Sequence, residues 1–174
     1  MGHEKGDRVG MYSPNISEWV LTQYACHRAD LILVNVNPAF QTEELSYALK
    51  KVGVKTLVMP PSFKASNYVE IVRKLVPDLG KNGKLGVDSS EFPEFKNVII
   101  CSDTQEEAGM MKFSELYKNH GAEEQRIMTE REAAMSCEDA TNIQFTSGTT
   151  GFPKGATLSH FNILNNATSI STVQ

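Results

Sequence analysis

Hydroxyl side chains, glycines and one lysine are concentrated in a single segment of this sequence, residues 146–155. The hydroxyl-bearing residues are Thr146, Ser147, Thr149 and Thr150, and the glycines are Gly148, Gly151 and Gly155. Glycine allows positive φ and a close approach of the backbone to a ligand. Pro153 holds Phe152 extended and stiffens the turn, and Lys154 adds one mobile positive charge. Because backbone N–H groups, hydroxyls and an ammonium group together hold polyphosphate, we predict a phosphate-binding loop.

The spacing within this segment excludes two commoner nucleotide-binding loops. A Walker A loop has glycine directly before its lysine and Ser or Thr directly after it. Here Pro153 precedes Lys154 and Gly155 follows it. A dinucleotide-binding fingerprint needs G-x-G-x-x-G after a strand, and the glycines of residues 80–86 have neither that spacing nor a preceding strand.

The remaining reactive side chains indicate packing or solvated surfaces, so we assign neither a metal site nor a catalytic residue. The histidines at positions 3, 27, 120 and 160 lack metal-ligand spacing, and we expect a packing or capping role for His160. Acidic pairs at 43–44, 106–107, 123–124 and 138–139 are expected on solvated faces. Cys26, Cys101 and Cys137 are far apart, which is typical of a reducing compartment and excludes a disulfide framework.

Length and composition indicate one domain or a piece of a larger protein. The 174 residues include 17 Lys and Arg against 21 Asp and Glu, a net charge of −4, and 40% are hydrophobic. No apolar run approaches the roughly 20 residues that span a bilayer, and no basic, aromatic stripe indicates nucleic-acid binding. No export or transit peptide is visible at the N-terminus. We expect that an upstream segment, with any targeting signal, is missing.

Short apolar runs alternate with segments of helical period, which predicts an α/β fold with a mostly parallel, helix-covered sheet. Strands are expected at 9–12, 31–36, 55–59, 97–102 and 142–145, and helices at 16–24, 42–52, 69–76 and 113–117. Residues 78–96 are expected to form a loop, and residues 119–138 either a surface linker or a weak helix. Ligands on such sheets bind beyond the carboxyl ends of the strands, where residues 146–155 would lie.

Three local features of these elements are specific enough to test. Trp19, Val20 and Tyr24 share helical spacing and are expected to form the buried face of the first helix. Thr42 is expected to cap the N-terminus of the second helix, and Gly53 to end that helix in the left-handed conformation.

The segment SGTTGFPKG, residues 147–155, resembles the signature loop of adenylate-forming enzymes, which include acyl-CoA synthetases, luciferases and adenylation domains of peptide synthetases. The similarity extends upstream through residues 6–10, 13–15, 36–38 and 44–53. Residues 142–148 and 155–160 are most similar to medium-chain acyl-CoA ligases of the acyl-CoA synthetase family member 2 type. Relatives usually carry glycine where Asp30 stands, and Asp tolerates the left-handed conformation, so we expect the turn to be preserved.

The resemblance implies a two-step reaction that uses ATP, Mg²⁺ and coenzyme A. A fatty-acid carboxylate attacks the α-phosphate of ATP, and the thiol of coenzyme A then displaces AMP from the acyl-adenylate. In such enzymes the signature loop holds the β- and γ-phosphates with Mg²⁺ alongside. Thr146 to Lys154 would take that role here, and Lys154 would offset charge as pyrophosphate leaves.

Several later segments of the family pattern are not found in these residues. They are the Tyr-Gly-x-Thr-Glu segment that contacts the adenylate, the Thr-Gly-Asp segment that contacts the ribose, and the C-terminal domain with its catalytic lysine. We therefore expect residues 1–174 to be an incomplete N-terminal AMP-binding domain that makes no acyl-CoA by itself. Subfamily resemblance suggests a mitochondrial location, and a cytoplasmic one otherwise. Two alternatives stay open: an aryl or aminoacyl adenylating enzyme, and a non-catalytic phosphate-binding or interaction protein made as a short product.

Overall fold

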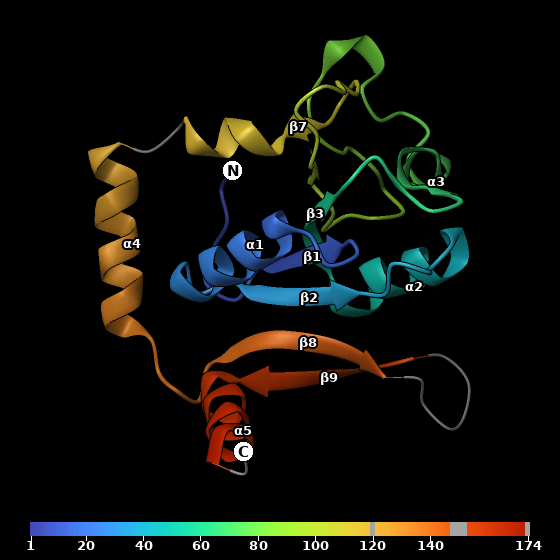
Figure 1. Cartoon of the computed structure of the whole chain (residues 1–174). Helices are drawn as coiled ribbons and strands as arrows, with labels where there is room; N and C mark the ends of the chain where they lie inside the picture. The colour runs from blue at the N-terminus through green and yellow to red at the C-terminus, as the bar shows by residue number, and fades with distance from the viewer. Residues whose placement is uncertain (119–120, 147–152, 173–174) are drawn as a thin grey trace.

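A mostly parallel sheet forms the centre of the computed structural model, which describes residues 1–118, 121–146 and 153–172 (Figure 1). Its strands in spatial order are β7 (Met111–Lys112), β6 (Asn97–Ile100), β3 (Val54–Met59), β1 (Arg8–Tyr12), β2 (Ile32–Val36), β8 (Ala140–Thr146) and β9 (Lys154–Ser159). Neighbouring strands are parallel except β8 and β9, which are antiparallel. The predicted fold class is confirmed.

The helices lie on the two faces of this sheet and at the side of the molecule (Figure 1). They are α1 (Ser17–Arg28), α2 (Thr42–Val52), α3 (Tyr68–Leu75), α4 (Ala122–Ala134) and α5 (His160–Thr172), with the 3₁₀ turns η1 (Lys81–Gly83) and η2 (Phe113–Tyr117) and a small hairpin of β4 (Ser62–Phe63) and β5 (Ser66–Asn67). Because successive strand residues point to opposite faces, Tyr12 and Leu57 pack in one apolar cluster with α2 and α3, while Met11 and Val58 pack in a second with α1 and η2. No helix in the described ranges is both long and apolar enough to cross a membrane.

Two local predictions about the helices were wrong. On α1, Val20 is 48% and Tyr24 62% exposed, whereas Thr22 and Cys26 are buried. Trp19 does pack against the core as expected, and together with Thr22 and Cys26 it forms a buried face rotated by about 100° from the predicted one. Helix α2 is capped by Gln41 and not by Thr42, since the Gln41 N–H donates to Glu44 Oε2 at 2.9 Å. Gly53 does end α2 in the left-handed conformation, with φ 61°.

Residues after η2 contain more regular structure than the sequence indicated. Of the two alternatives for residues 119–138, the helical one is observed: α4 has no buried residue and stands at the side of the molecule (Figure 1). Polar contacts hold it, because the Arg131 guanidinium donates to Ala29 O at 2.9 Å and to His3 O at 2.6 Å. The strand β9 and the helix α5 after the predicted loop were not expected.

Asp30 makes the turn between α1 and β2 in the left-handed conformation, with φ 57°, as the sequence predicted. Its carboxylate is 2.9 Å from Lys5 Nζ, and its side chain is only 3% exposed. We expect Asp30→Gly to change the free energy of unfolding by less than about 1 kcal/mol, because relief of backbone strain offsets the lost ion pair. Asp30→Ala keeps the strain and loses the pair, so it should cost about 1–3 kcal/mol more. Urea denaturation of both variants measures the difference, and equal midpoints would contradict this account.

Candidate phosphate-binding site

The two residues that flank the predicted phosphate loop lie on neighbouring antiparallel strands. Thr146 ends β8 and Lys154 begins β9, and the two residues are register partners. The Thr146 hydroxyl donates to Lys154 O at 3.4 Å. Six predicted ligand residues lie outside the described residues: Ser147, Gly148, Thr149, Thr150, Gly151 and Phe152. The structure therefore shows the base of the loop.

Contacts with α2 fix Pro153 and the start of β9, where the chain re-enters the sheet after the loop. The Tyr47 hydroxyl donates to Pro153 O at 3.2 Å, directly before Lys154. At Gly155 a Cβ atom would lie 3.2 Å from Ile143 Cγ2 and 3.5 Å from Val52 Cγ1, so a larger residue would displace its neighbours. Glycine at this position lets β9 pass close to α2. Lys154 is the first residue of β9, so the position of this strand fixes the Lys154 backbone opposite Thr146.

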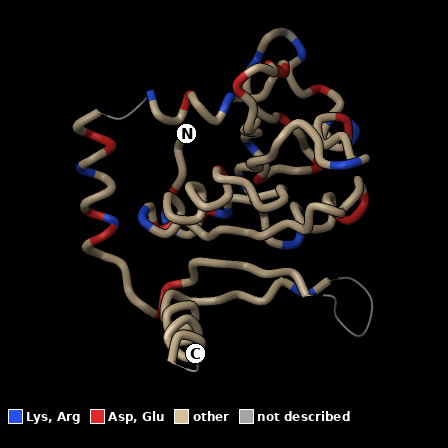
Figure 2. The backbone as a smooth tube through the Cα atoms, in the orientation of Figure 1, with Lys and Arg blue, Asp and Glu red and all other residues tan. Residues whose placement is uncertain are grey.

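Lys154 is the only lysine, arginine, aspartate or glutamate between positions 140 and 172. Figure 2 shows the contrast between the β8, β9 and α5 region, which is almost free of charge, and the charged surfaces of α4 and the upper loops. The Lys154 side chain is exposed, and within the described ranges no carboxylate forms an ion pair with it. Its ammonium group is thus available to an anionic ligand.

A pocket of about 320 Å³ opens beside the loop base, at the carboxyl ends of β1, β2 and β8. Its lining residues come from the ends of these strands, the segments that follow them and α1: Ser13, Pro14, Asn15, Trp19, Asn35, Val36, Asn37, Pro38, Gln144 and Phe145. Strand β1 lies between β2 and β3, and the chain crosses from β2 to β3 through α2. The pocket borders β1, at which the strand order reverses, and it opens beyond the carboxyl ends of the strands, where α/β sheets bind ligands.

Three side-chain amides form a network at this pocket, in which Asn35 and Gln144 line the pocket and Asn142 lies behind them. Asn142 Oδ1 accepts hydrogen bonds from Gln144 Nε2 at 2.9 Å and from Asn35 Nδ2 at 3.5 Å. Asn35 Oδ1 is buried and has no partner, so it can accept a hydrogen bond from a ligand. This network could not be read from the sequence, because only the parallel pairing of β2 with β8 brings the residues together. Polar side chains within otherwise apolar strands were the available signal.

Two stacked tyrosines hold the segment that follows β2, which lines the pocket. The rings of Tyr12 and Tyr68 have centroids 4.0 Å apart. The Tyr12 hydroxyl donates to Phe40 O, and the Tyr68 hydroxyl donates to Pro38 O at 2.8 Å. Burial raises the pKa of Tyr12, and burial raises the pKa of Tyr68 to about 12. Both phenols therefore stay protonated and keep donating at any ordinary pH.

The other candidate side chains behave as structural groups. The rings of His27 and His160 pack edge to face with centroids 5.6 Å apart, which confirms a packing role for His160. Burial raises the pKa of Cys26 to about 12 and that of Cys101 to about 12, so neither thiol is activated. The described parts of the chain contain no group of three or more His, Cys, Asp or Glu side chains that could hold a metal ion.

Comparison with known proteins decides the family. The family model described as "AMP-binding enzyme" matches residues 1–174. The chain belongs to the AMP-binding enzyme family. It is 46% identical over 172 residues to "Medium-chain acyl-CoA ligase ACSF2, mitochondrial" of Bos taurus, covering 98% of this chain and 28% of that protein. It is 42% identical to the protein of the same name from Danio rerio, covering 95% of this chain and 27% of that protein.

Solved structures of two CoA synthetases have the same fold. Acetoacetyl-CoA synthetase from Streptomyces lividans matches with a TM-score of 0.71 at 20% identity, over 95% of this chain and 23% of that chain. A fatty acyl CoA synthetase from Mycobacterium tuberculosis matches with a TM-score of 0.64 at 19% identity, over 98% and 28%. The chain thus spans about a quarter of the length of the curated ACSF2 relatives named above.

Proposed function

We propose that residues 1–174 are the ATP-phosphate-binding part of an acyl-CoA ligase that activates a medium-chain fatty acid. One observation carries this proposal: Lys154, which has no carboxylate partner in the described residues, is the register partner of Thr146, the residue after Phe145 in the lining of the strand-end pocket. Membership of the AMP-binding family supports the reaction type, and the similarity to medium-chain ligases supports the substrate class.

The proposed reaction solves the problem that a carboxylate has no usable leaving group. One carboxylate oxygen forms a bond to the α-phosphorus of ATP, and the bond from that phosphorus to the bridging oxygen of pyrophosphate breaks. The thiolate sulfur of coenzyme A then bonds to the acyl carbon, and the bond to AMP breaks. The products are acyl-CoA, AMP and pyrophosphate.

The residues of this chain would act on the departing pyrophosphate. Lys154 would neutralise charge that develops on the β-phosphate, and Thr146 would donate a hydroxyl at the start of the loop. Residues 147–152 would supply backbone N–H groups. Mg²⁺ would bind together with ATP, since proteins commonly hold this ion through the phosphates of the substrate and retained water molecules. We assign no general acid or base to this chain.

Tyr47 is proposed as a positioning residue in this reaction. Its hydrogen bond to Pro153 O sets the backbone one residue before Lys154, so it acts on the phosphates only through that lysine.

The similarity to proteins named as mitochondrial leads us to propose a mitochondrial location, and subcellular fractionation of the source cells tests it.

The isolated 174-residue chain should bind inorganic tripolyphosphate and MgATP yet form no octanoyl-CoA from octanoate, ATP and coenzyme A. The reason is that the ligase relatives are about four times longer, and we expect the acyl and coenzyme A sites to need their remaining residues. Calorimetry measures binding and a thioester assay measures turnover. Thioester formation by the pure chain would show that the site is complete within these residues.

The endogenous polypeptide provides the complementary experiment. An antibody against residues 122–138 reports its size, and the captured protein is tested for octanoate-dependent exchange of pyrophosphate into ATP. A chain of ligase length with exchange activity supports the proposal. A chain of about 19 kDa without exchange activity would overturn it in favour of a non-catalytic phosphate-binding protein.

A further inference from the structure

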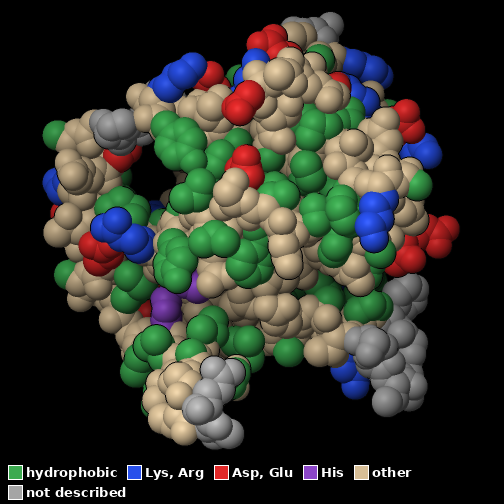
Figure 3. Space-filling model, viewed as in Figure 1, with side chains coloured by type: hydrophobic (Ala, Val, Ile, Leu, Met, Phe, Trp, Pro, Cys, Tyr) green, Lys and Arg blue, Asp and Glu red, His purple; other side chains and the backbone are tan. Residues whose placement is uncertain are grey.

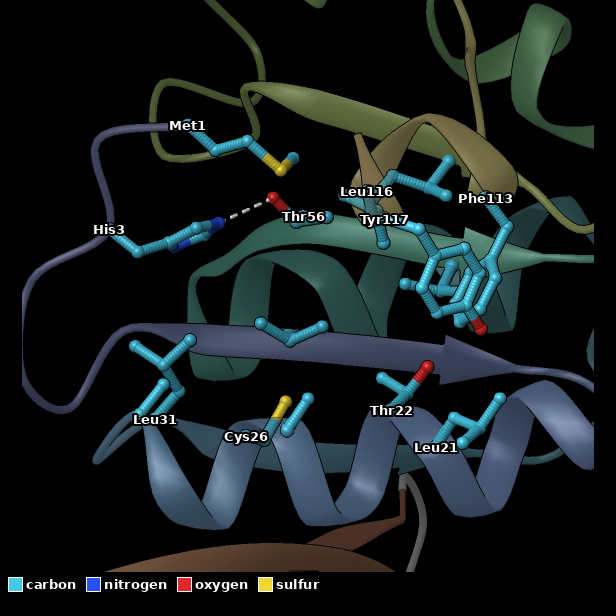
Figure 4. Close-up of a pocket in the computed structure, with 15 residues that line it drawn as sticks. Met1, His3, Leu21, Thr22, Cys26, Leu31, Thr56, Phe113, Leu116 and Tyr117 are labelled. Carbon is cyan, nitrogen blue, oxygen red and sulfur yellow. Dashed lines mark hydrogen bonds between the residues drawn. The ribbon is translucent and has the colours of Figure 1, made fainter. Parts of the chain in front are cut away.

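A second and larger hollow, of about 430 Å³, lies on the sheet face covered by α1 and η2. Figure 4 shows its walls: α1 contributes Leu21, Thr22 and Cys26, and η2 contributes Leu116 and Tyr117. Strand residues Val9, Val58 and Ile99 form the floor. In the space-filling view, apolar side chains gather around a hollow between α4 and the body of the molecule (Figure 3). It shares no lining residue with the pocket at the strand ends.

Among the residues that the structure describes, no lysine, arginine, aspartate or glutamate side chain lines this hollow. Its titratable nitrogen bases are the Met1 amino group and the His3 ring, and His3 Nε2 is hydrogen-bonded to Thr56 Oγ1 at 2.8 Å. Burial lowers the pKa of His3, and this outweighs the nearby Asp7 carboxylate, so the ring is uncharged at neutral pH. Figure 4 shows Met1 and His3 at the end of the hollow away from Thr22, so a carboxylate or phosphate beside Thr22 would lose its hydration without an adjacent opposite charge. The fatty acid, ATP and coenzyme A of the proposed reaction are thus poor ligands for it.

One polar group in the wall remains unsatisfied. Thr22 is only 6% exposed, and its Oγ1 atom is buried without a hydrogen-bond partner in the described parts of the chain. Figure 4 shows the hydroxyl directed from α1 toward the space below η2. A buried hydroxyl without a partner costs free energy that a ligand oxygen would recover.

We propose that this hollow binds an uncharged alkyl compound that ends in a single hydroxyl or carbonyl group, with the Thr22 hydroxyl as its polar contact. The apolar walls take the chain, and Thr22 hydrogen-bonds the head group. The volume is within the range of about 300–1,000 Å³ that is usual for small-molecule sites. This proposal does not depend on the proposed function, because no group of the phosphate site takes part.

The test compares 1-octanol with octanoate on the 174-residue chain at pH 7.5, observed by NMR of alanine methyl groups. Ala25 and Ala29 line the hollow, whereas Ala48 is buried on the other face of the sheet and serves as an internal control. We expect octanol to shift the Ala25 and Ala29 signals and to bind at least 30-fold more tightly than octanoate. Shortening the alcohol by two methylene groups should weaken binding about 15-fold.

Variants separate the polar contact from the apolar one. Thr22→Val should weaken octanol binding about three- to tenfold and leave the binding of toluene, which has no hydrogen-bonding group, unchanged. Ala25→Trp should abolish the binding of both compounds by filling the hollow. Val20→Trp is the matched control, since Val20 lies on α1, is 48% exposed and does not line the hollow. Should Ala25→Trp fail to fold, Thr22→Val still decides.

Three results would overturn the proposal. Octanoate could shift Ala25 and Ala29 as strongly as octanol does, which would mean that charge is tolerated. Thr22→Val could leave octanol binding unchanged, which would remove the polar contact. Ala25→Trp could convert a self-associated chain to monomers in sedimentation without affecting octanol, which would identify the hollow as a surface for a second copy.

Discussion

Lys154→Met is expected to weaken the binding of tripolyphosphate and MgATP to the 174-residue chain by about 10- to 100-fold. A hydrogen bond between charged groups contributes about 1.5–3 kcal/mol, and no other cation between positions 140 and 172 can replace this one. Methionine keeps a side chain of similar length and removes only the ammonium group. Calorimetric titration at fixed ionic strength measures the loss, because salt screens exposed charges.

The matched control for this prediction is Lys74→Met. Lys74 is exposed near the end of α3, far from the loop in sequence, and its replacement changes the net charge by the same amount. It should leave binding within about twofold. Tyr47→Phe should give an intermediate loss of about two- to fivefold, because it removes one neutral hydrogen bond that positions Lys154. Equal losses in the two lysine variants would mean that binding follows net charge and not this site.

Gly80→Ala is expected to destabilise the fold by about 3–5 kcal/mol. Gly80 has φ 78°, and a Cβ atom there would lie 2.3 Å from the carbonyl carbon of Ala108. The contact is with backbone, so no rotation of a side chain relieves it. It is also reciprocal, because a Cβ at Gly109 would lie 2.4 Å from the Gly80 nitrogen. Unfolding in urea, followed by circular dichroism, measures the cost.

Gly83→Ala in the same loop isolates the conformational part of that cost. Gly83 has φ 69°, but a Cβ atom there would meet nothing within 4 Å. We expect a loss of about 1 kcal/mol, the ordinary cost of placing alanine in the left-handed region. If Gly80→Ala and Gly83→Ala lower the free energy of unfolding equally, the steric clash between a Cβ at position 80 and the backbone of residues 108–109 adds no cost.

The order of strands and helices was predictable because it depends on local periodicity. Runs such as Val54–Met59 are apolar and bounded by Gly53 and Pro60, and the α2 positions Leu45, Ala48 and Leu49 repeat at helical spacing and are all buried. Signals of this kind lie within a few residues of each other. Tertiary contacts only select which face is buried.

Features that depend on tertiary contacts were not predictable. The buried face of α1 is set by how the helix lies on β1 and β2, and so Thr22 and Cys26 were buried in place of Val20 and Tyr24. Strand β9 contains Gly155 and Ala156, which are poor strand formers, and it exists because β8 offers a partner in register. The segment with the chemistry was recognisable from residue types. The amide network beside it was not, since Asn35 and Asn142 are 107 positions apart.

The pairing of β2 with β8 also sets an order for folding. Residues 8–112 contain the five strands from β7 to β2, and each pairs within that range. Strand β8 joins them only at the outer side of β2, where Leu33 pairs with Asn142 across more than a hundred intervening residues. Contacts of such separation carry a larger loop-closure entropy and form late. Chains fold from the N-terminus on the ribosome, so one side of β2 stays unpaired until β8 has been synthesised. The phosphate loop, which follows β8, is therefore the last functional part of this sheet to be assembled.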